Sequence, residues 1–147
     1  MSSPEVRVAF VCVQNAGRSQ MAAAFAERER RERGLEEDVE LVSGGTRPAD
    51  CVHDSVVEVM AETGDDLAER TPRSIAPEEL ERATVVITMG CSASDVCPAT
   101  WSGESRDWAL DDQHGRPVHE VRAIREDVRR RVRELFDEIE REMSQRV

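Results

Sequence analysis

A cysteine and an arginine bracket a short segment near the start of the chain. Cys12 and Arg18 stand six positions apart in VCVQNAGRS, and Ser19 follows directly. The apolar run from Val8 to Val11 predicts a buried strand, and apolar residues recur at helical spacing from Met21 to Phe25. The residues from Cys12 to Arg18 are therefore predicted to form the turn between a strand and a helix.

This turn predicts an anion-binding site with a nucleophile. A tight loop that opens a helix directs backbone N–H groups inward, and the helix N-terminus adds partial positive charge, so a tetrahedral oxyanion is the expected ligand. Arg18 would hold the anion through paired hydrogen bonds. The same donors would stabilise a thiolate at Cys12, while Ser19 is expected to cap the helix and to donate a hydrogen bond to the sulfur.

Strand-like and helix-like segments alternate along the rest of the chain. Further strands are predicted at 39–45 and 84–90, and helices at 55–62, at 76–83 and from about residue 117. One apolar stripe marks the last helix, at Val118, Val121, Ile124, Val128, Val132, Leu135 and Ile139. This alternation predicts an α/β fold with a parallel sheet, whose ligands bind beyond the carboxyl ends of the strands.

Composition limits the function classes. The 147 residues fit one domain spanning 1–147, and no apolar run is long enough to cross a membrane, so a cytoplasmic protein is expected. The net charge is −11, from 31 acidic residues and 20 basic residues that are all arginine, which argues against nucleic-acid binding. Four cysteines in a reducing compartment indicate transient, chemical disulfides.

Three segments resemble a known family. VCVQNAGRSQMA resembles the phosphate-binding loop of the low-molecular-weight protein tyrosine phosphatase superfamily, and more closely that of its thiol-dependent arsenate reductase branch. ATVVITMGCSASDVCP resembles the redox-cysteine segment of that branch, and RDWALDDQHGRPVHEVRAIREDVRRRV its acidic loop and closing helix. The resemblance implies a three-layer α/β sandwich with a four-stranded parallel sheet, an active site in the loop after the first strand, and no cofactor.

The resemblance also implies a role for each matching residue. Cys12 is the nucleophile, Asn15 holds the loop geometry, Arg18 binds the oxyanion, Ser19 supports the thiolate and Asp112 is the general acid. The oxyanion-binding loop comprises Val13, Gln14, Asn15, Ala16, Gly17, Arg18 and Ser19.

Three positions depart from the family pattern. Gln113 replaces the proline that usually follows the acidic residue, which leaves Asp111 as a second candidate for the acid. Gln14 stands where the phosphatases usually have glycine, which suggests a loop variant. Gly17 stands where many of them carry a second loop cysteine, so that safeguard against oxidation is missing here.

The remaining cysteines bear on the choice between two reactions. A phosphatase needs one thiolate, whereas an arsenate reductase needs further thiols, because sulfur must attack the arsenic–sulfur adduct. Cys91 and Cys97 follow a predicted strand, and their spacing is not a zinc signature. Either they are incidental, or they relay a disulfide to thioredoxin or to a small-molecule thiol, which is the reading we favour.

Three hypotheses follow. Arsenate reduction is favoured, and hydrolysis of phosphotyrosine or another phosphomonoester is the alternative, although the chain has no tyrosine to wall an aromatic pocket. Trp108 either lines the pocket or packs under the last helix. A regulator that binds oxyanions without turnover is disfavoured, because a binder needs no nucleophile.

No metal site is predicted from the sequence. The pair Cys51 and His53 is assigned no role, and neither are His114 and His119.

Overall fold

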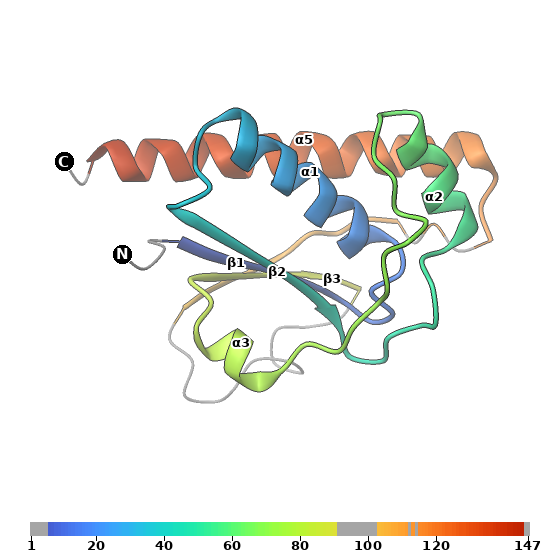
Figure 1. The fold of residues 1–147 in the computed structure, drawn as a ribbon, viewed down its shortest axis with the longest axis horizontal. Coiled ribbons are helices and arrows are strands. Elements are labelled where there is room, and N and C mark those ends of the chain that lie inside the picture. The colour runs from blue at the N-terminus through green and yellow to red at the C-terminus, as the bar shows by residue number, and fades with distance from the viewer. Residues whose placement is uncertain (1–5, 91–102, 112, 114, 146–147) are drawn as a thin grey trace.

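The computed structural model of the chain describes residues 6–90, 103–111, 113 and 115–145 (Figure 1). Its elements are β1 (Val6–Cys12), α1 (Arg18–Glu32), β2 (Val39–Gly45), α2 (Asp54–Ala61), α3 (Pro77–Glu81), β3 (Val85–Met89), β4 (Glu104–Asp107) and α5 (Val118–Gln145). The strands and helices predicted from periodicity are confirmed, with small shifts at their ends. β4 is an addition, because its sequence ESRD carries no apolar pattern.

The four strands form one parallel sheet in the order β2-β1-β3-β4. In the register of the sheet, Cys12 at the end of β1 pairs with Gly45 of β2 on one side and with Met89 of β3 on the other. From β1 the chain first adds β2 on one side of β1 and then adds β3 on the opposite side. The direction in which strands are added therefore reverses between β1 and β3. Cys12 thus lies at the point where open parallel sheets bind their ligands.

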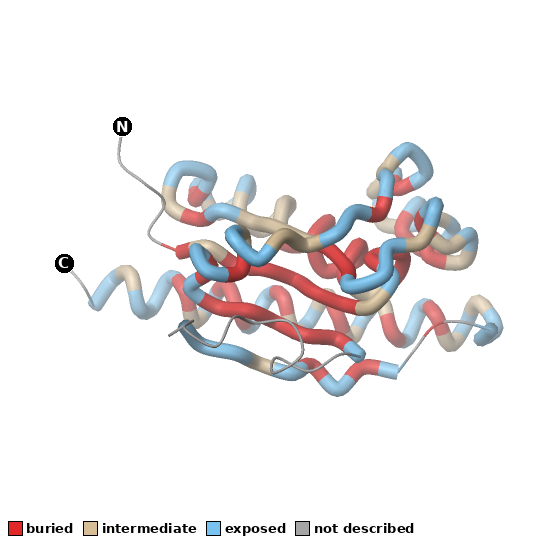
Figure 2. Tube along the Cα trace, turned by 90° about the horizontal axis from the view of Figure 1, so that it is seen from below, coloured by how far each residue is buried: buried red, intermediate tan, exposed pale blue. Residues whose placement is uncertain are grey.

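The helices cover the sheet on both faces. α1, α2 and α5 lie on one face and α3 lies on the other, which makes the three layers expected from the family resemblance (Figure 1). Figure 2 shows the central strands as largely buried, while buried and exposed stretches alternate along α5. Buried residues on one stripe of α5 confirm the predicted apolar face, apart from Val118, which is partly buried. Within the described ranges, no helix is both long and apolar enough to cross a membrane.

Helix ends follow the expected signals. α1 stops at Glu32, and Gly34 two positions later has φ +67, a left-handed conformation that glycine adopts without strain. α3 begins at Pro77, and the carboxylate of Glu79 accepts a hydrogen bond of 3.0 Å from the backbone N–H of Ala76. A glycine just beyond a helix and a proline at its first position are common helix-end signals.

Trp108 packs in the core. It follows β4, is 7% exposed, and its ring centroid lies 5.9 Å from that of Phe10 in a tilted arrangement. It belongs to the same buried cluster as the apolar stripe of α5. Of the two roles considered for this ring, packing is therefore the one that the fold supports.

A charged cluster joins the end of α2 to the start of α5. Arg122 donates to both carboxylate oxygens of Glu62 at 2.8–3.0 Å, and Arg125 donates to the same carboxylate at 2.7 Å. These hydrogen bonds, Arg122 first and Arg125 second, hold the pKa of Glu62 at about 2, below its ordinary value of 4.5. The carboxylate therefore stays ionised in the folded state down to low pH.

Glu62→Gln is expected to flatten the dependence of the free energy of unfolding on pH. A carboxyl whose pKa is lower in the folded than in the unfolded state adds stability above about pH 4.5, and this part is lost as the pH falls toward 2. Urea unfolding at a series of pH values and low ionic strength measures the slope. Glu134→Gln is the control, since Glu134 is exposed on α5 with no ion pair among the described residues. Equal slopes for the two variants would contradict the prediction.

Candidate active site

The loop between β1 and α1 turns its carbonyl groups outward. Four of them accept backbone N–H groups of the segment after β2 at 2.7–3.2 Å: Cys12 from Thr46, Val13 from Arg47, Gln14 from Ala49 and Ala16 from His53. In a trans peptide the N–H points opposite to the preceding C=O. The N–H groups that follow these four carbonyls therefore point into the loop, as an anion site requires.

Cys12 lies at the floor of this loop. Its side chain is almost wholly buried, and its Sγ accepts a hydrogen bond of 3.1 Å from the backbone N–H of Asn15 and lies 2.8 Å from Oγ of Ser19. The hydroxyl of Ser19 itself accepts a hydrogen bond of 2.8 Å from the side-chain amide of Asn15. This leaves the proton of the Ser19 hydroxyl for the sulfur, so two hydrogen-bond donors converge on the Cys12 sulfur.

The predicted capping role of Ser19 is wrong. α1 begins at Arg18, its N-cap residue is Gly17, and the cap carries no side-chain hydrogen bond. Ser19 lies inside the first turn, where the loop turns its hydroxyl toward Cys12 and away from the backbone N–H groups of the helix.

Asn15 adopts a left-handed conformation, with φ 51, that asparagine tolerates better than most residues. Its Oδ1 accepts hydrogen bonds from the backbone N–H of Arg73 at 3.0 Å and from Nε2 of Gln20 at 3.2 Å. Gln20 also donates to the backbone carbonyl of Asn15 at 3.0 Å. Gln20 and the Arg73 backbone thus support the loop, and no sequence pattern marked either of them.

Gly45 allows the end of β2 to touch the loop. A Cβ atom at this position would lie 2.5 Å from the carbonyl oxygen of Val13 and 3.0 Å from the backbone N of Asn15. The second glycine of the predicted strand end is therefore required for close approach of two backbones, which a side chain would prevent.

Arg18 connects the loop to two other segments. Its Nη1 donates a hydrogen bond of 3.2 Å to the carbonyl oxygen of Leu110, the residue directly before Asp111. Gly90 follows β3 and has φ +85, and a Cβ atom at this position would lie 2.7 Å from Nη2 of Arg18. The guanidinium therefore lies where the carboxyl end of β3 and the segment after β4 meet the loop.

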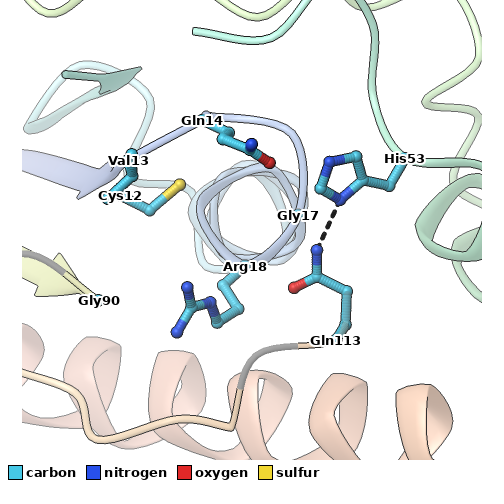
Figure 3. Close-up of a pocket in the computed structure, with 8 residues that line it drawn as sticks. All are labelled: Cys12, Val13, Gln14, Gly17, Arg18, His53, Gly90 and Gln113. Atoms are coloured by element: carbon cyan, nitrogen blue, oxygen red, sulfur yellow. Dashed lines mark hydrogen bonds between the residues drawn. The ribbon is translucent and has the colours of Figure 1, made fainter. Parts of the chain in front are cut away.

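These residues surround a cavity of about 310 Å³ (Figure 3). Its lining residues are Cys12, Val13, Gln14, Gly17, Arg18, His53, Gly90 and Gln113. The other predicted loop residues, Asn15, Ala16 and Ser19, are buried. They act on the cavity through the hydrogen bonds described above.

His53 was assigned no role from the sequence, yet it lines the cavity. Its backbone N–H donates to the Ala16 carbonyl, and its Nδ1 lies 2.7 Å from Nε2 of Gln113. A single histidine in a loop carries no signal of such a position. Cys51, its partner in the sequence pair, is exposed and does not line the cavity.

In the described part of the chain, no group of three or more histidine, cysteine or acidic residues could hold a metal ion.

Four residues considered in the sequence analysis lie outside the described residues: Cys91, Cys97, Asp112 and His114. Asp111, the second candidate for the acid, is described. It is exposed and lines a different hollow, together with Arg116 and Glu120. His119 is exposed as well.

Comparison with known proteins gives the site a family. Residues 7–145 match the family described as low molecular weight phosphotyrosine protein phosphatase. The chain belongs to this family. A putative arsenate reductase of Halobacterium salinarum is 58% identical over 129 residues, which cover 88% of this chain and 89% of that protein. The resemblance inferred from the loop, the cysteine segment and the acidic loop is thereby confirmed.

Solved structures with the low molecular weight phosphotyrosine protein phosphatase fold resemble this chain as well. A thioredoxin-dependent arsenate reductase of Corynebacterium glutamicum matches with a TM-score of 0.76 and 34% identity, over 95% of this chain and 64% of that chain. This chain thus spans less than two thirds of the Corynebacterium protein. A structure described as an arsenate reductase in the phosphate binding state matches with a TM-score of 0.76 and 29% identity, over 91% and 98% of the two chains.

Proposed function

We propose that this chain is an arsenate reductase that binds arsenate above Cys12 and is restored by thioredoxin or a small-molecule thiol in the cytoplasm. One observation carries the proposal: the Cys12 sulfur, with two hydrogen-bond donors on it, faces a cavity lined by loop N–H groups and Arg18. Relatives described as arsenate reductases support arsenate as the substrate. The residue roles follow the family resemblance.

The first step forms a bond between sulfur and arsenic. The Cys12 thiolate attacks the arsenic atom of hydrogen arsenate, and the arsenate hydroxyl departs as water after it takes a proton from the Asp112 carboxyl. Arg18 and the inward N–H groups hold the remaining oxygens and the charge that develops on them. Arsenic remains in the +5 state.

The second step reduces arsenic. The Cys91 thiolate attacks the sulfur of Cys12, so a disulfide forms while the arsenic–sulfur bond breaks and leaves its electron pair on arsenic. Arsenic becomes +3 and departs as arsenite, and the two sulfurs are oxidised. Cys97 then attacks Cys91 and frees Cys12, and the external thiol reduces the resulting Cys91–Cys97 disulfide.

We expect the purified protein, supplied with a thiol reductant, to form arsenite from arsenate and to hydrolyse p-nitrophenyl phosphate weakly or not at all. Among the described residues that line the cavity, none is phenylalanine, tyrosine or tryptophan, so the cavity lacks the large aromatic side chain that would pack against a phenyl ring. Arsenite release and nitrophenol release, measured on one preparation, give the comparison. Vigorous nitrophenol release without arsenite would instead support a phosphatase.

A further inference from the structure

The side-chain amide of Gln113 has an unusual environment in the cavity. Gln113 is 2% exposed, and its Nε2 lies 2.7 Å from Nδ1 of His53. Its Oε1 is buried and has no hydrogen-bond partner in the structure as described. A buried amide oxygen without a partner is costly, and it indicates a group that a ligand completes.

His53 determines which end of the amide faces the cavity. An amide nitrogen can only donate, so Nδ1 of His53 is the acceptor in this hydrogen bond. The amide oxygen is then turned away from His53, toward the side on which Arg18 lies (Figure 3). The imidazole is itself placed by its backbone, which donates to the loop carbonyl of Ala16 at 2.9 Å.

Gly17 brings the amide close to the anion site. A Cβ atom at Gly17 would lie 2.3–2.6 Å from the three atoms of the Gln113 amide group. Only a residue without a side chain leaves this space, so the amide lies directly against the backbone at the start of α1. The unpaired oxygen is therefore beside the loop N–H groups that would bind the oxyanion.

An acceptor among these donors distinguishes between oxyanions. It repels a fully deprotonated oxygen, and it is satisfied by a hydroxyl group. Hydrogen arsenate and hydrogen phosphate carry such a hydroxyl at neutral pH. Sulfate and the dianion of a phosphomonoester carry none.

We propose that Oε1 of Gln113 accepts a hydrogen bond from the hydroxyl of the bound oxyanion, so that the cavity selects oxyanions that carry a proton. Gln113 is then a specificity-determining residue, and His53 is a positioning residue that keeps the oxygen directed at the ligand. For arsenate as the natural ligand, this inference rests on the proposed function.

Inorganic phosphate and sulfate are the probes that isolate the hydroxyl. At mildly alkaline pH both are tetrahedral dianions of similar size, and only hydrogen phosphate has a proton to donate. Isothermal titration of the reduced wild-type protein is expected to give a dissociation constant for phosphate that is at least about tenfold lower than that for sulfate. Equal affinities would overturn the proposal.

Gln113→Met tests the acceptor, because it keeps the length of the side chain and removes the amide. The ratio of the two dissociation constants is expected to fall close to one. Gln14→Met is the matched control, since Gln14 also lines the cavity but is exposed. This change is expected to alter both affinities by a similar factor and to keep the ratio. An unaltered ratio in Gln113→Met would overturn the proposal.

His53→Ala and His53→Asn test the positioning role. Alanine frees the amide to turn its NH₂ group toward the anion, so sulfate should bind more tightly than in the wild type. Asparagine offers an acceptor oxygen close to the place of Nδ1 and should restore the wild-type ratio. If both variants kept the wild-type ratio, His53 would have no positioning role.

These measurements separate the inference from the proposed function, because anion binding needs no turnover. A protein that prefers phosphate to sulfate but forms no arsenite would overturn only the arsenate reductase proposal. A protein that forms arsenite yet binds the two anions equally would overturn only the role of Gln113.

Discussion

Cys12→Ser is expected to reduce arsenite formation to background. A serine hydroxyl is hardly ionised at neutral pH, and Ser19 and the Asn15 backbone supply donors that suit a thiolate. Serine also cannot enter a disulfide, so the reduction step is lost even if the anion still binds. An arsenite assay measures the loss. Cys51→Ser is the matched control, because Cys51 is exposed and outside the cavity, and it should change little.

The other cysteine variants should stop the reaction at different stages. Cys97→Ser is expected to complete one turnover and to retain a disulfide between Cys12 and Cys91, because the thiol that would resolve it is missing. Cys91→Ser should stall at the arsenic–sulfur adduct unless an external thiol replaces it. Peptide mass mapping after arsenate treatment identifies these species. A wild-type disulfide between Cys12 and Cys51 would contradict the proposed relay.

Asp112→Asn is expected to lower turnover by about 10²- to 10⁴-fold while oxyanion affinity stays close to that of the wild type. An amide cannot supply the proton that the departing oxygen needs, but it leaves Arg18 and the loop donors intact. Single-turnover formation of the adduct measures the chemical step, and titration with inorganic phosphate measures the affinity. A parallel loss of affinity would mean that Asp112 acts in binding.

Asp111→Asn is the matched control for this loss. Asp111 is exposed and lines a hollow other than the Cys12 cavity, so its substitution should have little effect on turnover. The opposite result, a harmless change at Asp112 and a large loss at Asp111, would move the acid by one residue. The glutamine at position 113 makes this comparison necessary, because the usual proline is absent as a marker of the position.

Features that depend on neighbours in the sequence could be predicted from the sequence. The turn between β1 and α1 can be predicted because an apolar strand, a cysteine, an arginine and a helical repeat follow one another closely in the sequence. The buried stripe of α5 follows from apolar residues at steps of three and four. Such patterns are local, because backbone geometry sets their periods.

β4 could not be predicted from periodicity, because most of its residues are exposed and polar. Among the strands that the structure describes, it pairs with β3 alone, at the edge of the sheet, where burial demands no apolar alternation. The role of the Ser19 hydroxyl could not be predicted from its neighbours in the sequence either. Its place near a helix start suggested a cap, but the folded loop brings the Cys12 sulfur within reach of its hydroxyl.

The sequence by itself determined the place of the loop between β1 and α1, the alternation of strands and helices, and the family. Only the tertiary structure decided which other side chains face Cys12. His53 and Gln113 are 60 positions apart, and no spacing pattern links them. They meet because the segment after β2 binds the loop carbonyls and because Gly17 leaves room for an amide. Contacts of this kind depend on how separate elements pack, which a local sequence pattern does not contain.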